Sequence, residues 1–261
     1  MPTGSELSTD SSSRTDPATG EPHGQYPTAL VGLPGTGSDA DYVQRAFGPA
    51  ATRLGLELIA SQPADDLVAG HLAVLDEAAR NHRSILVGGV SIGAALAVRW
   101  ALTRELSAPD PTVGRCAGIL AALPPWSGDD RHAPARASAT ATADSIRDLG
   151  LEATISAMRA SSPAWLADEL ARSWAFFGDR LESQLRQAAA FVSPRTDEIA
   201  RLRTPLAITA SLDDPIHPLL VARAWCEAAP RAAVTELPLA EWGTDPALLG
   251  DTTARTWTAL L

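Results

Sequence analysis

Cysteine is scarce in this chain, and basic residues are outnumbered by acidic ones. Among 261 residues there are two cysteines, Cys116 and Cys226, whose spacing fits neither a metal site nor a redox motif. Since free cysteine is usually buried, we expect both to be core or near-core residues. Lys and Arg total 21 against 31 Asp and Glu, without a basic cluster, which argues against a nucleic-acid partner and against an anionic membrane surface.

The chain also lacks a long apolar run and the pattern of a signal peptide. The least polar stretch, 85–98, contains glycines and a serine and is too short to span a bilayer. The N-terminus has no basic start followed by an apolar segment, so we expect a cytoplasmic protein with no membrane span. No metal or other cofactor is indicated, because the grouping of Asp129, Asp130 and His132 is typical of a solvated loop. The oligomeric state is not indicated.

Local composition separates a polar tail from the remainder of the chain. Residues 1–27 are mostly Ser, Thr, Asp, Gly and Pro, and we predict a disordered tail because so few apolar side chains cannot offset the entropy of ordering. From residue 28, short apolar runs alternate with amphipathic stretches. Strands are expected at 29–33, 56–60, 84–89 and 115–123, and helices at 38–54, 65–81 and 92–105.

This alternation is typical of βαβ units and predicts an α/β protein with a mostly parallel, doubly wound sheet. Over 125–203 only loops and helices are expected, with helices at 137–149, 151–160, 164–177 and 180–192. The alternation then resumes with strands at 205–210 and 233–237 and helices at 219–229 and 246–261. We therefore predict one α/β core, built from 28–124 and 204–261, with a helical cap inserted at 125–203.

One short segment has the pattern of a nucleophile turn. Gly89-Val90-Ser91-Ile92-Gly93 fits G-x-S-x-G, and it follows an expected strand and opens an expected helix. In such a turn the serine sits on a strained backbone, and its neighbours two residues away must be small because strand and helix nearly touch. The alternative is a tight turn with a buried or helix-capping serine.

A second glycine-containing loop, Pro34-Gly35-Thr36-Gly37, follows the first expected strand. A nucleophilic serine needs backbone N–H groups that hold the developing oxyanion. Ile92 supplies one such group and Thr36 the other, while Gly35 lets the backbone approach a substrate closely. The alternative is a glycine turn that only leads into a helix.

These residues resemble the α/β-hydrolase superfamily. The resemblance covers 28–261 and rests on Leu33-Pro34-Gly35-Thr36-Gly37, Gly89-Val90-Ser91-Ile92-Gly93 and Asp213-Asp214-Pro215-Ile216-His217-Pro218. A helical cap between the sixth and seventh strands of that fold also matches. The resemblance implies an α/β-hydrolase fold, Ser91 as nucleophile and an acid in the third segment, where Asp214 fits better than its rival Asp213.

The chain departs from this family at the histidine that serves as base. The family places it after the last strand, where this chain reads Leu239-Ala240-Glu241-Trp242-Gly243, with Glu241 or Trp242 at the corresponding position. A serine still needs a base near neutral pH. His217 is our candidate, and His132 is the alternative. The remaining histidines are expected in the tail (His23) or in structural roles (His71 and His82).

Aromatic residues are concentrated in and beside the expected cap. Trp126, Trp165 and Trp242, together with Gly35, are our candidates for binding an apolar acyl or ring-containing substrate. The alternative is that these aromatic side chains only attach the cap to the core.

The residues favour a serine hydrolase that cleaves an apolar carboxylic ester or thioester through an acyl-enzyme. The same groups could run acyl transfer if the cap excludes water. A non-catalytic small-molecule binder is the alternative from another class, supported by the missing histidine. A dinucleotide-binding loop at Gly35-Thr36-Gly37 is the weakest interpretation, because the third glycine of G-x-G-x-x-G is absent.

Overall fold

The computed structural model describes residues 26–108, 110 and 112–261, so most of the predicted tail lies outside the described part of the chain. Within these residues six strands form one sheet in the order β2-β1-β3-β4-β5-β6, and every neighbouring pair is parallel. The strands are β1 (Ala29–Leu33), β2 (Glu57–Ala60), β3 (Ser84–Val90), β4 (Arg115–Ala122), β5 (Leu206–Ser211) and β6 (Ala232–Leu237). The predicted parallel sheet is confirmed.

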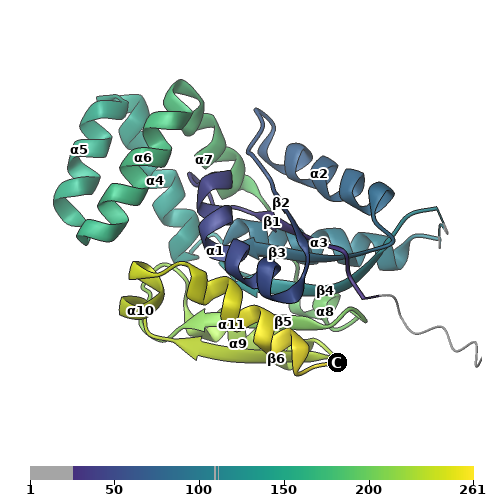
Figure 1. The fold of residues 1–261 in the computed structure, drawn as a ribbon. Helices are drawn as coiled ribbons and strands as arrows, with labels where there is room; N and C mark the ends of the chain where they lie inside the picture. Colours follow the sequence, from purple (N-terminus) through teal and green to yellow (C-terminus); the bar gives the residue numbers. More distant parts are fainter. Residues whose placement is uncertain (1–25, 109, 111) are drawn as a thin grey trace, which may run out of the picture.

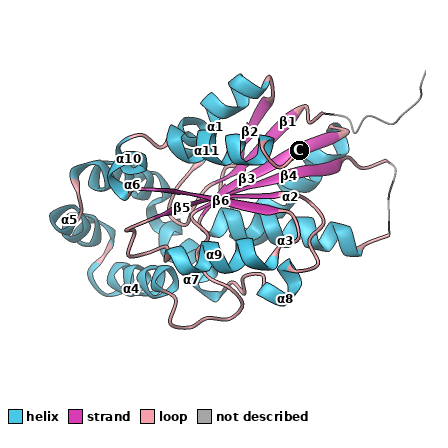
Figure 2. Ribbon diagram, turned by 90° about the horizontal axis from the view of Figure 1, so that it is seen from below, coloured by secondary structure: helices cyan, strands magenta, loops and turns pink. Residues whose placement is uncertain are grey.

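Helices cover both faces of this sheet (Figure 2). One face packs against α1 (Ala40–Leu54) and α11 (Ala247–Thr258), and the other against α2 (Leu67–Asn81), α3 (Ile92–Leu106) and α9 (Leu219–Ala228). The central strands are buried on both sides, which explains their nearly continuous apolar sequence. In β1 the side chains alternate, since Val31 and Leu33 join the core under α3 and Leu30 joins the core under α1.

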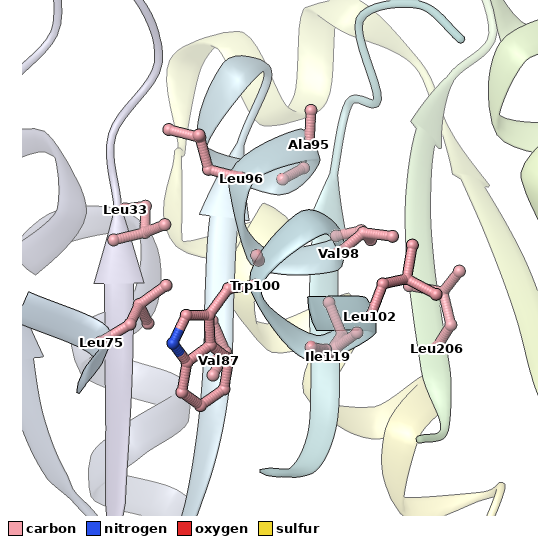
Figure 3. Packing of buried hydrophobic residues seen from close by; sticks show 14 of the residues in the cluster. Leu33, Leu75, Val87, Ala95, Leu96, Val98, Trp100, Leu102, Ile119 and Leu206 are labelled. Atoms are coloured by element: carbon pink, nitrogen blue, oxygen red, sulfur yellow. The ribbon is translucent and has the colours of Figure 1, made fainter. Parts of the chain in front are cut away.

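Figure 3 shows the larger of the two cores, which lies between the sheet and the α2–α3 layer. Leu33, Val87 and Ile119 come from three adjacent strands and are fully buried. Trp100 of α3 packs among them and donates from Nε1 to Asp76 Oδ1 of α2 at 2.7 Å. Each buried aliphatic side chain contributes about 1.5–3 kcal/mol, so this layer fixes α3 firmly against β3.

The order of the strands places a topological switch point at the carboxyl ends of β1 and β3. The chain runs from β1 to its neighbour β2 on one side and then to β3 on the other side. Helix α1, after β1, leaves toward one face, and α3, after β3, leaves toward the opposite face. Ligands bind at such switch points in open α/β sheets.

A helical insertion separates β4 from β5. It contains α4 (Pro134–Leu149), α5 (Leu151–Ser161), α6 (Ala164–Phe177), a 3-10 turn (Gly178–Arg180), α7 (Leu181–Ala190) and α8 (Thr196–Ile199). Its helices α4–α7 gather beyond the carboxyl ends of the strands (Figure 1), whereas α8 packs against α3 and α9. Ala143, Trp174, Phe177 and Leu181 form a small core of its own. We call residues 125–203 the helical insertion.

No helix in the part of the chain that the structure describes combines the length and the apolar character needed to cross a bilayer.

Close packing of α11 on α1 depends on Gly250. A Cβ atom at Gly250 would lie 2.1 Å from the carbonyl oxygen of Ala46 in α1, so any side chain there forces the helices apart. We expect Gly250→Ala to lower the free energy of unfolding by about 1–3 kcal/mol, measured by urea denaturation. Thr258→Ala, on the exposed side of the same helix, should change it by less than about 0.5 kcal/mol. Equal effects would contradict this packing.

Candidate functional site

Ser91 lies on a strained turn between β3 and α3. Its backbone has φ 55° and ψ −120°, in the left-handed region that non-glycine residues avoid. Such a conformation costs about 1–3 kcal/mol and persists only where the surroundings enforce it. The Ser91 N–H donates to Ala122 O at 3.0 Å, and its carbonyl accepts from the N–H groups of Ala94 and Ala95. The hydroxyl is thereby held at the start of α3, above the end of β3.

The two glycines of the motif are required by this turn. A Cβ at Gly89 would lie 2.2 Å from the carbonyl carbon of Gly93, and a Cβ at Gly93 would lie 2.5 Å from Leu33 O of β1. Strand β3, helix α3 and the end of β1 therefore meet in backbone contact around Ser91.

The loop after β5 places a histidine and an acid against Ser91. His217 Nε2 lies 2.9 Å from Ser91 Oγ, and His217 Nδ1 lies 2.6 Å from Asp214 Oδ2. Both side chains are largely buried, with exposed fractions of 14% for His217 and 6% for Asp214. If Nδ1 carries the proton and donates it to Asp214, Nε2 is free to accept from the serine hydroxyl. The structure thus brings three of the predicted residues into one hydrogen-bonded series.

Asp214 is held as a carboxylate. Burial raises its pKa, but the hydrogen bond from His217 and the backbone N–H of Ile216, 2.8 Å from Oδ1, lower it by more. The pKa of Asp214 therefore lies below the ordinary value of 3.8. Asp213 does not reach His217: its Oδ1 accepts from the Leu239 N–H at 2.7 Å. Of the two rival acids, Asp214 has the geometry to orient the imidazole.

The other described histidines make their contacts with residues other than Ser91. His132 is exposed, and its backbone N–H donates to Asp130. His71 is fully buried, with Nδ1 2.7 Å from Ser61 Oγ, and burial lowers its pKa to about 4. His82 contacts Thr28 Oγ1 at 3.1 Å. His23 lies outside the described residues.

A short helix, α10 (Leu239–Thr244), follows β6 in a segment for which the sequence predicted neither a helix nor a strand. Its six residues are too few to produce a recognisable helical pattern in the sequence. Trp242 of α10 is buried, donates from Nε1 to Ser211 Oγ at 3.1 Å, and meets Trp165 edge to face at 5.8 Å. Trp242 thus supports the end of β5, from which the loop carrying Asp214 departs.

The loop after β1 passes directly beside Ser91. A Cβ at Gly35 would lie 3.5 Å from Ser91 Cβ. Ile92 is the first residue of α3, so its N–H belongs to the unpaired group at a helix start. Among the described residues, no hydrogen-bond acceptor is found for the backbone N–H of Thr36 or of Ile92. Being unpaired is what a role of these two N–H groups as oxyanion donors requires.

The predicted substrate-binding tryptophans lie in three different surroundings. Trp126 is buried, with the Arg136 guanidinium 5.3 Å above its ring. Trp165 lines a cavity of about 340 Å³ between α1, α6 and α10, together with Tyr42 and Gly243, and Ser91 is not among the lining residues. Trp242 packs on Trp165 as described above. Their contact with a substrate stays a prediction.

Within the described residues, no group of three or more His, Cys, Asp or Glu side chains is placed to hold a metal ion.

Comparison with known proteins supports the architecture. No family model matches the sequence, and no curated protein sequence matches it significantly. A hydrolase structure from Oleispira antarctica aligns at 15% identity and a TM-score of 0.67, covering 90% of this chain and 92% of that one. A thermophilic esterase from Thermogutta terrifontis aligns at 15% identity and TM-score 0.59, covering 89% and 88%. An alpha/beta hydrolase from Sphaerobacter thermophilus aligns at 15% and 0.57, covering 88% and 94%.

At these identities the likeness shows the fold alone. The expected α/β-hydrolase fold, a parallel sheet with helices on both faces, is confirmed.

The carboxyl titration of Asp214 tests the electrostatics of this site. In the native chain its NMR midpoint should lie below 3.8. His217→Ala removes a lowering contact while burial continues to raise the pKa, so the midpoint should move upward. Asp39 is the internal control. Burial raises its pKa and Arg172 helps to lower it, and its titration midpoint should not change in this variant. An unchanged Asp214 midpoint would contradict the account.

The lowered pKa of Asp214 also makes the stability of the fold depend on pH. Because the folded-state pKa of Asp214 is lowered, its ionised form stabilises the fold above the unfolded value of about 3.9. That contribution is lost as the pH falls through the folded-state pKa.

Proposed function

We propose that this chain, which has the α/β-hydrolase fold, is a serine hydrolase that cleaves an apolar carboxylic ester or thioester through an acyl-enzyme. One observation supports this above the others: the hydrogen-bonded series Asp214–His217–Ser91 at the carboxyl end of the sheet. A nucleophile within hydrogen-bond reach of a base that a third group orients is the arrangement of covalent acyl transfer.

In the first half of the proposed reaction, Ser91 Oγ attacks the ester carbonyl carbon while His217 Nε2 takes its proton. The tetrahedral intermediate carries its negative charge on the former carbonyl oxygen, which accepts from the N–H groups of Thr36 and Ile92. The intermediate collapses, the bond to the leaving oxygen or sulfur breaks, and His217 gives the proton to that atom. An alcohol or thiol departs, and the acyl group stays on Ser91.

In the second half, a water molecule gives its proton to His217 and its hydroxyl oxygen attacks the acyl carbon. Collapse of the second tetrahedral intermediate returns the proton to Ser91 Oγ and releases the carboxylic acid. Asp214 keeps the imidazole in the required tautomer and stabilises its protonated form in both halves. Its lowered pKa keeps it ionised at neutral pH, which suits that role.

An apolar small molecule is the substrate class that the surroundings favour. The helical insertion covers the end of the sheet that carries Ser91, and it brings aromatic side chains with it. Gly35 gives a substrate close access to the backbone, and we assign Trp126, Trp165 and Trp242 to its apolar surroundings. One protein of similar fold is an esterase, the same kind of activity that we propose for this chain.

Two alternative functions fit the same site. Acyl transfer would follow if an alcohol or amine, instead of water, reached the acyl-enzyme under the insertion. A non-catalytic binder is favoured by one specific feature, the tryptophan-bearing helix α10 where the family has its histidine.

Labelling with a fluorophosphonate and hydrolysis of p-nitrophenyl butyrate test the proposal together. The native chain should be labelled at Ser91 and should hydrolyse the ester. Ser91→Ala and His217→Ala should each lower kcat/KM by about 10³-fold or more, and Asp214→Asn by about 10²–10⁴-fold. His132→Ala, which removes an exposed histidine, should leave both readouts unchanged.

Other outcomes would redirect the assignment. A folded native chain that neither labels nor hydrolyses would favour the non-catalytic binder. Labelling that survives His217→Ala would move the base elsewhere, and ester cleavage only in the presence of an alcohol or amine acceptor would indicate acyl transfer.

A further inference from the structure

Three consecutive residues of α6, in the helical insertion, contact the loop that follows β1. Arg172 binds Asp39, Ser173 donates to Gly37, and Trp174 packs on Gly37. These partners are separated by more than 130 positions in the sequence. The same loop carries Thr36, one of the two proposed oxyanion donors.

The contact of Ser173 with Gly37 is fully enclosed. Ser173 has no exposed surface, and its Oγ donates to Gly37 O at 2.7 Å. Gly37 has φ 71°, which favours glycine, and a Cβ there would lie 2.8 Å from Nε1 of the buried Trp174. The loop therefore has little room to move against α6.

A charged pair fixes the loop two residues further on. Asp39 is buried, with both carboxylate oxygens accepting from Arg172, at 2.8 and 2.9 Å. The same carboxylate accepts from the Tyr42 N–H at 3.2 Å and so caps α1. Such bidentate pairs combine strength with a defined geometry.

Thr36 lies between two fixed points. On one side, β1 ends at Leu33, which is anchored in the sheet and touches Gly93. On the other side, α6 holds Gly37 and Asp39. Within the loop itself, the Ser38 N–H donates to Gly35 O at 3.1 Å.

We propose that Ser173 and Arg172 are positioning residues that set the Thr36 N–H against Ser91, so that the oxyanion hole is complete only when the helical insertion is docked. This inference rests on the proposed function for its catalytic consequence. Its structural part, the immobilisation of residues 34–39 by α6, does not.

The insertion offers a matched control at another contact. Gln187 of α7 accepts from the Leu67 N–H at 2.8 Å and donates to Asp65 O at 2.8 Å. These bonds also attach the insertion to the core, but they reach the start of α2 and leave the loop carrying Thr36 untouched. Gln187→Ala therefore loosens the insertion without releasing that loop.

The first experiment compares the native chain, Ser173→Ala and Gln187→Ala by hydrogen–deuterium exchange. We expect faster exchange in the peptide covering 34–39 for Ser173→Ala and native-like exchange there for Gln187→Ala. Unchanged exchange of this peptide in Ser173→Ala would overturn the inference. This readout holds whether or not the chain hydrolyses esters, so it separates failure of the inference from failure of the proposed function.

The second experiment measures kcat, KM and inhibition by a boronic acid, whose serine adduct carries the tetrahedral charge. Ser173→Ala should lower kcat by about 10-fold or more, with KM within about twofold, and should weaken the boronate by a similar factor, because misplacing one oxyanion donor acts on the transition state. Gln187→Ala should keep kcat within about twofold. Equal losses of kcat in both variants, or a loss of thermal stability in Ser173→Ala with kcat unchanged, would overturn the inference.

Discussion

Backbone contact between β1, β3 and α3 is the constraint on which the site depends. Gly89 and Gly93 allow the strand, the helix and Leu33 to approach within distances that no Cβ would permit. The buried layer of α3 against the sheet supplies the packing that holds Ser91 in its left-handed conformation. Stability gained in the core is thereby used to hold a strained residue at the surface of the sheet.

The source of the histidine is the main departure from the family pattern. His217 and Asp214 are three residues apart on one loop, so a single segment after β5 provides both the proposed base and its orienting acid. In this proposal the segment after β6 does not supply the base, and it forms α10 instead. Trp242 and the Asp213–Leu239 contact now support the loop from that side. Geometry, more than chain order, defines such a constellation.

Much of this architecture follows from local sequence patterns. The buried strands were predictable because parallel strands covered on both faces are continuously apolar. The turn at Ser91 was predictable because strand and helix nearly touch there, which requires the two glycines of the motif. His217 was predictable as a neighbour of Asp214 at the carboxyl end of a strand. Helix α10 was missed because six residues carry no period.

The contacts of Arg172, Ser173 and Trp174 were not predictable in the same way. They join segments far apart in the chain, and α6 looks like an ordinary amphipathic helix in sequence. Which face of that helix meets the loop after β1 is decided by how the insertion docks on the core. Only the three-dimensional arrangement shows that relation.

The structure of a phosphonate adduct tests the central account most directly. We expect the phosphorus to be bonded to Ser91 Oγ, with its oxygen about 2.7–3.1 Å from the N–H groups of Thr36 and Ile92 and with His217 Nε2 facing the serine. An adduct on another residue, or a phosphonyl oxygen turned away from both N–H groups, would contradict it.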